Sequence, residues 1–444
     1  MNFRGVAHVA IRVRTRFPRP FRRMLIPLVT LTAALHLSGG LPVSTPRAVG
    51  MSADRLATVD HIVQRGITAG AYPGAAVVIG RRGYAVYQKG YGRLNWSPKS
   101  AAVDPAGSIY DLASLTKVIA LTTAAMILHD EGRLPLDAKV QSFLPAFTGP
   151  SKDRVTIAHL LTHRSGLPAG RQLWKTARTP AEARAQVLET NLQTAPGAVF
   201  NYSDLGPAVL GMVIERITGE SLDKFVTQRI FFPLGMTDTE YLPDPSLRNR
   251  IAPTNATPPR GYPLLGEVDD ESAFALGGVS GHAGLFGTAT DLSIFAQMLL
   301  NGGTYNGVRI VTDTTIARFI TPVADHRALG WEVANQERGA GEYLSAHAYG
   351  HTGFTGTSIW LDPDRDMFVI LLTNRVHAAR ARRPGTIIAD VRHDVADAAA
   401  LAVTDEPLLR QVAWPRTFRV DQAVDWSPRV RPLDKRPTTK PKGK

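Results

Sequence analysis

Runs of apolar residues bounded by turn signals predict β-strands near both ends of the chain. Residues 74–80 (GAAVVIG) and 84–91 (YAVYQKGY) lie on either side of a three-residue connection that ends in glycine, which predicts a β-hairpin. Residues 358–361 (SIWL) and 368–373 (FVILLT) predict two more strands, with an Asp-Pro-Asp turn between them. The four strands therefore come from two regions that are far apart in the sequence.

Apolar residues at helical spacing predict helices around these strands. The predicted helices cover residues 52–67, 114–129, 205–217 and 386–402, and the region from about 130 to 330 consists mostly of helical pieces and Pro- and Gly-rich loops. The strands from both ends would form one antiparallel sheet flanked by helices, and the middle region would form a mostly helical second lobe. The predicted fold class is α/β of the α+β type, with a cleft between the lobes as a natural place for a site.

The net charge of +13 is concentrated at the two ends of the chain. Residues 1–50 carry eight Arg and no acidic residue, and residues 429–444 carry a further net charge of +6. This leaves about −1 for residues 51–428, so the folded body is close to neutral. A protein that binds nucleic acid is expected to carry its basic residues on the fold itself, so the charge pattern argues against a nucleic-acid partner.

The N-terminus has the features of an export signal. An Arg-rich stretch ends at Arg22-Arg23, an apolar run follows over residues 24–35, and small residues lie around 38–40. The apolar run is short for a membrane span, so residues 1–40 predict a secretory signal and a bacterial protein of the periplasm or cell envelope. A twin-arginine route and an uncleaved anchor with N-terminal membrane association remain open.

Cysteine is absent from the sequence, which excludes disulfides and a thiol nucleophile. Residues 404–444 are predicted to be a C-terminal extension that follows the main domain. From about residue 429 this extension is rich in Pro and Lys, a composition that predicts a disordered basic tail. An exported protein without cysteine must depend on its hydrophobic core for stability.

Ser114 and Lys117 are the first candidates for chemistry. They are three residues apart at the start of a predicted helix, so both side chains project from the same face. The first-turn amides and the helix dipole favour negative charge there, which would help a serine alkoxide to form. Val118, Ile119 and Leu121 surround the lysine with apolar material. Burial of this kind lowers the pKa of an amine, so we expect Lys117 to be available as a neutral base.

Two loop segments later in the chain carry further candidates. Tyr202-Ser203-Asp204 lies in a loop before the predicted helix 205–217. His351-Thr352-Gly353 runs into the predicted strand 358–361. Gly353 allows close approach of the backbone to a ligand, and the amide that follows it could donate to an oxyanion.

The three segments together resemble the ordered motifs of the penicillin-recognising serine hydrolases. These motifs are S-x-x-K, then Y-x-N or Y-x-D, then K-T-G or H-T-G. The resemblance covers about residues 52–403 and is closest to the beta-lactamase-like branch, which holds class C beta-lactamases, low-molecular-mass penicillin-binding DD-peptidases and family VIII esterases. Further stretches that resemble this branch are 159–168, 281–292, 329–331 and 371–377.

The resemblance implies a beta-lactamase/transpeptidase-like fold and an acyl-enzyme mechanism. Ser114 would attack the carbonyl carbon, and Lys117 and Tyr202 would share the general-base work. The backbone amides of Ser114 and Phe354 would form the oxyanion hole. The substrate would be an amide or ester, either a small molecule or a peptide derived from peptidoglycan, and no cofactor or metal is implied.

The resemblance also places Asp204, His351, Thr352 and Gly353 beside the nucleophile, where they would order the proton network or hold substrate. Two of them depart from the commoner family pattern. Asp204 stands where asparagine is usual, and a carboxylate near Lys117 would stabilise its ammonium. Either Tyr202 then carries more of the base work or Asp204 is turned away. His351 stands where lysine is more usual, and a largely neutral histidine would hold a drug carboxylate less well.

These departures favour a DD-peptidase or a carboxylesterase over an efficient beta-lactamase. A true beta-lactamase remains an alternative, as does a penicillin-binding sensor of the same fold that acylates without turnover. His159 and His163 have the spacing of metal ligands but lack the glutamate of a zinc protease motif. Residues 277–282 lack the second glycine of a nucleophile elbow, which argues against an alpha/beta-hydrolase.

Overall fold

The computed structural model describes residues 40–256, 258–324, 326–334 and 340–422. The predicted signal, apart from its last residue, and the predicted basic tail from about 429 lie outside these ranges, so both stay predictions. Among the helices that are described, none has the length and apolar character needed to cross a membrane.

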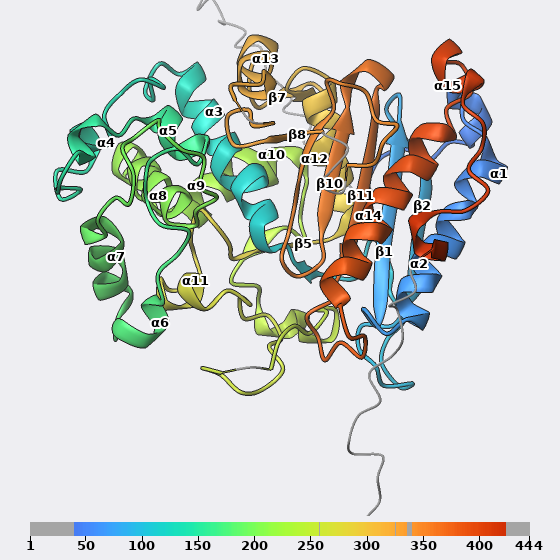
Figure 1. Cartoon of the computed structure of the whole chain (residues 1–444), viewed down its shortest axis with the longest axis horizontal. Coiled ribbons are helices and arrows are strands. Elements are labelled where there is room, and N and C mark those ends of the chain that lie inside the picture. Colours follow the sequence, from blue (N-terminus) through green and yellow to red (C-terminus); the bar gives the residue numbers. More distant parts are fainter. Residues whose placement is uncertain (1–39, 257, 325, 335–339, 423–444) are drawn as a thin grey trace, which may run out of the picture. The chain divides into compact units, whose positions relative to one another are not determined.

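The main sheet has six antiparallel strands and combines the two ends of the chain, as predicted (Figure 1). In order across the sheet, the strands are β2 (Tyr84–Gly92), β1 (Gly74–Arg81), β11 (Met367–Thr373), β10 (Ser358–Asp362), β9 (Tyr349–Thr352) and β8 (Glu332–Val333). The central pairing joins β1 to β11, with Ala75 opposite Thr373 and Arg81 opposite Met367. The hairpin and the two late strands are thus confirmed.

The two central strands are buried along their whole length because helices cover both faces of the sheet. On β1, Ala76 and Val78 belong to the core shared with the helical lobe. Their neighbours Val77 and Ile79 point the other way, into a second core beneath the helices at the chain ends. Because both faces are buried, the sequences of these strands are continuous runs of apolar residues and do not alternate between apolar and polar residues.

The helices of the second core come from both ends of the chain. They are α1 (Ala53–Leu56), α2 (Thr58–Thr68), α14 (Pro384–Leu401), α15 (Pro407–Gln411) and α16 (Arg419–Gln422). Helix α14 packs against α2 and α16, as the red and blue ribbons on one side of Figure 1 show. Leu409 and Val420 are buried in this core, so residues 404–422 of the predicted extension pack onto the same unit as residues 52–403.

The opposite face of the sheet is covered by α12 (Ala289–Leu300), which contacts both β1 and β11. The helical lobe contains α3 (Thr123–Asp130), α4 (Val140–Phe143), α5 (Ile157–Leu161), α6 (Leu173–Thr176), α7 (Pro180–Glu189), α8 (Leu205–Thr218), α9 (Leu222–Val226), α10 (Phe232–Leu234), α11 (Glu271–Ala275) and α13 (Asp313–Ile320). Short strands also occur in this region: β3 (Tyr110–Asp111), β4 (Glu240–Tyr241) and β5 (Leu285–Gly287) form one sheet, and β6 (Thr304–Tyr305) and β7 (Val308–Arg309) form a small hairpin.

The predicted single helix over residues 114–129 is divided into three parts. A 3₁₀ turn spans Ala113–Leu115, a π-helical segment spans Lys117–Thr122, and α3 follows. The hydroxyl of Thr122 donates to the carbonyl of Lys117 at 2.7 Å, and that of Thr123 donates to the carbonyl of Val118 at 3.1 Å. These side-chain bonds occupy carbonyls in the wide segment, and such π-helical segments often occur at functional sites.

Candidate active site

Ser114 and Lys117 are in direct contact. The Nζ of Lys117 donates to the Oγ of Ser114 at 2.8 Å and to the carbonyl of His282 at 3.0 Å. The same Nζ lies 2.7 Å from the Oδ1 of Asp204. The lysine side chain is only 3% exposed, so polar partners and not water satisfy the donors of its amine.

The protonation of Lys117 differs from the sequence-based expectation. Burial alone would lower the pKa of this amine, but the Asp204 carboxylate and Tyr202 outweigh burial and hold the pKa above its usual value. Asp204 is therefore not turned away from the site, and the expectation of a neutral lysine base is wrong for this arrangement. The ammonium is suited to donate to Ser114 and to stabilise an alkoxide on it.

The loop before α8 presents Tyr202 and Asp204 to the site because Ser203 anchors it. The amide of Ser203 donates to Nδ1 of His163 at 3.1 Å, and its hydroxyl donates to the carbonyl of Pro168 at 2.6 Å. The same hydroxyl accepts from the amide of Leu205 at 3.2 Å, at the start of the helix. Ser203 is buried, so its two neighbours are held on the side that faces Lys117.

Tyr202 lies between two histidine rings and two cations. Its ring centroid is 4.5 Å from that of His163 and 6.0 Å from that of His351. Nζ of Lys117 lies 5.1 Å from the tyrosine ring centroid, and the guanidinium carbon of Arg327 lies 5.5 Å from it. Burial, with the nearby Arg327 and Lys117 charges, holds the pKa of both histidines well below the usual value. Both rings are therefore neutral, and the positive charge around Tyr202 comes from Lys117 and Arg327.

The His351-Thr352-Gly353 segment ends β9 and packs directly on the approach to Ser114. Nδ1 of His351 donates to the carbonyl of Thr352 at 2.8 Å, which leaves Nε2 of the neutral ring as an acceptor. A Cβ at Gly353 would overlap with the hydroxyl of Thr357 and with the carbonyl of Leu112, so only glycine fits there. The next residue, Phe354, is 61% exposed.

Comparisons with known proteins were consistent with this geometry. The chain matches the family model described as Beta-lactamase over residues 59–392. It belongs to the beta-lactamase family. It is also 32% identical to an Escherichia coli (strain K12) protein named "Putative D-alanyl-D-alanine carboxypeptidase", over an alignment that covers 80% of this chain and 92% of that protein. The resemblance drawn from the three motifs is thereby confirmed.

Solved structures of the beta-lactamase fold also match. A penicillin-binding protein homologue from Caulobacter crescentus shares 20% identity with a TM-score of 0.63, covering 79% of this chain and 99% of that one. A family VIII carboxylesterase shares 20% identity with a TM-score of 0.60, covering 78% of this chain and 99% of that one. At this level of identity the similarity shows the shared fold.

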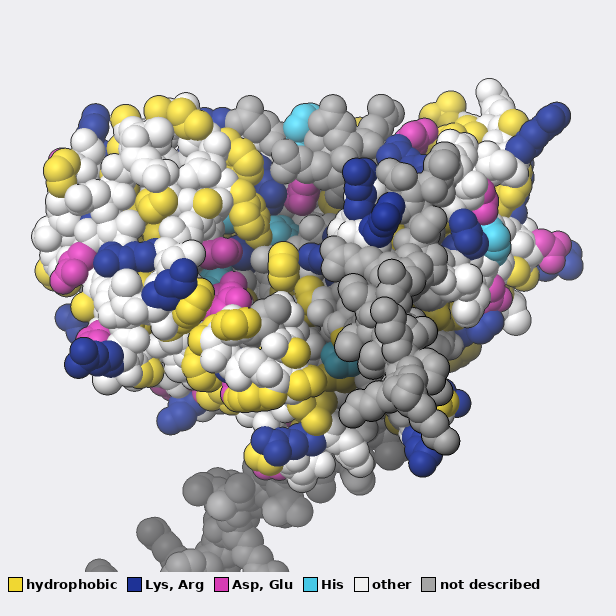
Figure 2. All heavy atoms as spheres, turned by 60° about the horizontal axis from the view of Figure 1, so that its bottom comes forward, with side chains coloured by type: hydrophobic (Ala, Val, Ile, Leu, Met, Phe, Trp, Pro, Cys, Tyr) yellow, Lys and Arg dark blue, Asp and Glu magenta, His cyan; other side chains and the backbone are white. Residues whose placement is uncertain are grey.

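Ser114 of this beta-lactamase-family chain lies where two hollows meet. One hollow, of about 340 Å³, is lined by Ser114, Tyr202, His351 and Phe354 and by the charged residues Arg327, Glu332, Arg375 and Arg392. The other, of about 250 Å³, is lined by Ser114, Phe354 and Asn255 and by the acidic residues Asp269, Asp270 and Glu271. We name them the cationic cleft and the acidic pocket. Figure 2 shows acidic, basic and histidine side chains close together near the middle of one face.

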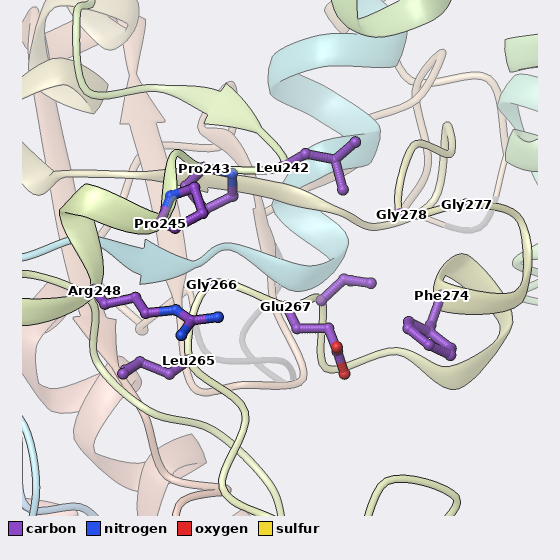
Figure 3. Close-up of a pocket in the computed structure, with 11 residues that line it drawn as sticks. Leu242, Pro243, Pro245, Arg248, Leu265, Gly266, Glu267, Phe274, Gly277 and Gly278 are labelled. Atoms are coloured by element: carbon purple, nitrogen blue, oxygen red, sulfur yellow. The ribbon is translucent and has the colours of Figure 1, made fainter.

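A third cavity, of about 470 Å³, is not lined by Ser114 (Figure 3). Its walls come from the loop after β4, from residues 265–268 and from the end of α11, with Arg248 and Glu267 among otherwise mostly apolar residues. None of the predicted site residues lines it. Val268 faces this cavity and Asp269 faces the acidic pocket, so one short segment separates the two.

The two histidines with metal-ligand spacing have other contacts. Nδ1 of His159 accepts from the amide of Thr156 as part of a capping box at the start of α5. His163 packs on Tyr202. Within the described ranges, no group of three or more side chains of the metal-ligating types is arranged to hold an ion.

Ser114, Lys117, Tyr202, Asp204 and His351, which the sequence motifs predict to share one site, lie together in the structure. The sequence motifs do not predict that His163 contacts Tyr202 or that three arginines line the cationic cleft. Arg327 is 5% exposed, and Arg392 lies on α14, 39 residues after Gly353. Their spacing carries no local signal, because only the packing of distant elements brings them to the cleft.

Proposed function

We propose that this protein is a serine hydrolase that forms an acyl-enzyme on Ser114 and removes the terminal residue from D-alanyl-D-alanine-type peptides. The observation that carries the proposal is the 2.8 Å contact between the Lys117 ammonium and the Ser114 hydroxyl, beside a cleft lined by three arginines. The first feature supports acyl transfer in general. The second supports a substrate that ends in a carboxylate.

In the proposed mechanism, Tyr202 is the general base that takes the proton from Ser114 as the hydroxyl attacks the carbonyl carbon. The cations of Lys117 and Arg327 lie 5.1 and 5.5 Å from the tyrosine ring centroid and would favour this base, and Lys117 also donates to the serine oxygen. The amides of Ser114 and Phe354 stabilise the tetrahedral oxyanion. The tyrosine then gives the proton to the leaving amine. In deacylation, Tyr202 takes a proton from the attacking water and returns it to the oxygen of Ser114 as the acyl bond breaks.

The cationic cleft is suited to a carboxylate on the leaving group. Arg327, Arg375 and Arg392 line the cleft, so three guanidinium groups border the space beside Ser114. Arg327 forms an ion pair with Glu332, with Nη2 and Oε2 3.7 Å apart, so this one carboxylate offsets only part of the positive charge of the three arginines. A bound carboxylate would accept from the guanidinium groups that line the cleft, in charge-assisted hydrogen bonds. The uncharged leaving group of a simple ester would not.

The acidic pocket would receive the acyl part of the substrate, because it lies on the other side of Ser114. Its carboxylates disfavour an acyl group that carries negative charge near the reacting carbon. A peptidoglycan-derived peptide also agrees with the predicted export signal, since such peptides occur outside the cytoplasm. Location in the periplasm or cell envelope is therefore part of the proposal.

A substrate panel tests the proposal. The purified protein should release D-alanine from a D-Ala-D-Ala peptide, and it should cleave the same peptide with a C-terminal amide much more slowly. Equal rates for the two peptides, or hydrolysis of short-chain p-nitrophenyl esters without any peptide cleavage, would contradict the carboxypeptidase assignment. Mass spectrometry after exposure to a penicillin should show a covalent adduct on Ser114. An adduct with no turnover of any substrate would indicate the sensor instead.

A further inference from the structure

The backbone just before Ser114 is held in an unusual conformation by Asp111. Ala113 has a φ angle of +47°, in the left-handed region that residues with a Cβ rarely adopt. The amide of Ala113 donates to Oδ1 of Asp111 at 2.8 Å. The carboxylate therefore stabilises the bend that presents Ser114 at the start of the 3₁₀ turn.

The second oxygen of the same carboxylate holds a different segment. Oδ2 of Asp111 accepts from the amide of Asp269 at 2.7 Å, across 158 residues of sequence. Asp269 lines the acidic pocket, and its segment separates that pocket from the cavity in Figure 3. A single side chain, 2% exposed, thus joins the nucleophile turn to the wall of the pocket beside it.

The main chain at Asp111 is tied to the third motif as well. The hydroxyl of Thr355 donates to the carbonyl of Asp111 at 2.8 Å, and that of Thr357 donates to the carbonyl of Leu112 at 3.0 Å. On the other side of the turn, Nη2 of Arg392 donates to the carbonyls of Gly353 and Thr357 at 2.6 and 2.8 Å. The turn that carries Phe354 is therefore bonded directly to the strand that leads to Ser114.

We infer that Asp111 is a positioning residue of the acyl-transfer site. It sets where the amide of Ser114 lies relative to the amide of Phe354, through Ala113 on one side and through the Thr355 contact on the other. This inference rests on the proposed function, in which those two amides stabilise the oxyanion. Donors at an oxyanion hole act only when they are placed accurately. Loss of the hydrogen bonds from the amides of Ala113 and Asp269 to the Asp111 carboxylate should therefore lower kcat and leave substrate binding nearly unchanged.

The direct test is Asp111→Asn. Asparagine has the same size, but only one of its two terminal atoms can accept a hydrogen bond, and its amino group would face a backbone donor. We expect kcat for the substrate found in the panel to fall about tenfold or more, with KM changed less than twofold. Circular dichroism and the unfolding temperature report whether the variant is folded.

Asp291→Asn is a matched control. Asp291 is also buried, and Oδ2 of its carboxylate accepts from the amide of Asp238 at 2.8 Å and from the hydroxyl of Thr239 at 2.9 Å. It lies on α12 and lines neither the cationic cleft nor the acidic pocket, so its replacement removes a comparable loop anchor and should leave kcat unchanged. A kcat for Asp111→Asn equal to that of Asp291→Asn would overturn the inference.

A second pair of variants covers the case in which Asp111→Asn does not fold. Thr355→Val removes the donor to the carbonyl of Asp111, whereas Thr355→Ser keeps a hydroxyl there. We expect Thr355→Val to lower kcat without changing KM, and Thr355→Ser to restore it. A lack of any difference between the two would contradict the inference. Hydrolysis that survives in Ser114→Ala would instead refute the proposed function itself, so the two failures are distinguishable.

Discussion

The cationic cleft and the acidic pocket share Ser114 and Phe354 but differ in charge. The cleft is built from residues of β8, β9 and α14 and of the loops around Arg327 and Arg375. The pocket is built from the segment at Asp269 to Glu271 and from Asn255. Positive charge on one side and negative charge on the other give a substrate a preferred direction across the nucleophile. Under the proposed function, the cleft would bind the leaving group and the pocket would bind the acyl group of the substrate.

The largest expected effect is that of removing the Ser114 hydroxyl, which borders both the cationic cleft and the acidic pocket. Ser114→Ala should lower hydrolysis at least about 10⁴-fold, because the covalent route is lost while both hollows remain. The rate with the best substrate measures this effect, and mass spectrometry should show no penicillin adduct. Ser97→Ala, at an exposed serine, should retain the wild-type rate.

A variant in the cationic cleft tests whether this cleft binds the C-terminal carboxylate of the substrate. Arg327→Gln should raise KM for a peptide with a free C-terminal carboxylate about tenfold relative to the same peptide with a C-terminal amide, since a buried charged donor is lost. The ratio of the two KM values separates carboxylate binding from any effect on Tyr202. Arg318→Gln, at an exposed position of α13, is the control, and a similar ratio in both variants would exclude Arg327 as the anchor.

The charge at Lys117 can be tested through the pH profile. Asp204 raises the pKa of Lys117, so Asp204→Asn should lower it, and the alkaline limb of kcat/KM should move to lower pH by about one unit or more. The sign follows from loss of the partner that favours the ammonium. An alkaline limb that does not move would mean that the ion pair does not control the protonation of the lysine in the reacting enzyme.

The smallest effect is expected in the acidic pocket. Glu271→Gln should change the preference between esters with cationic and anionic acyl groups by about two- to threefold, because the side chain is partly exposed and its charge is screened. The measurement is the ratio of kcat/KM values for the two esters. A larger loss for the anionic ester than for the cationic one would reverse the proposed orientation.

The strands were predictable because their signal is local. The burial of β1 and β11 on both faces required continuous apolar runs, and such runs are visible without any contact information. The helix predicted over residues 114–129 was less accurate. Its division into 3₁₀, π and α segments depends on the Thr122 and Thr123 hydroxyls and on the surrounding packing, which a period of apolar residues does not report.

The sequence by itself determined the family, the ordered motifs and the candidate nucleophile, because these depend on residue types at short spacing. Only the tertiary structure decided the protonation of Lys117, since the 2.7 Å contact with Asp204 joins two segments that are distant in sequence. It also decided the two opposite charges around Ser114 and the contacts of Asp111. Electrostatic energies and hydrogen bonds depend on distances of a few ångströms, and folding sets those distances between residues that are far apart along the chain.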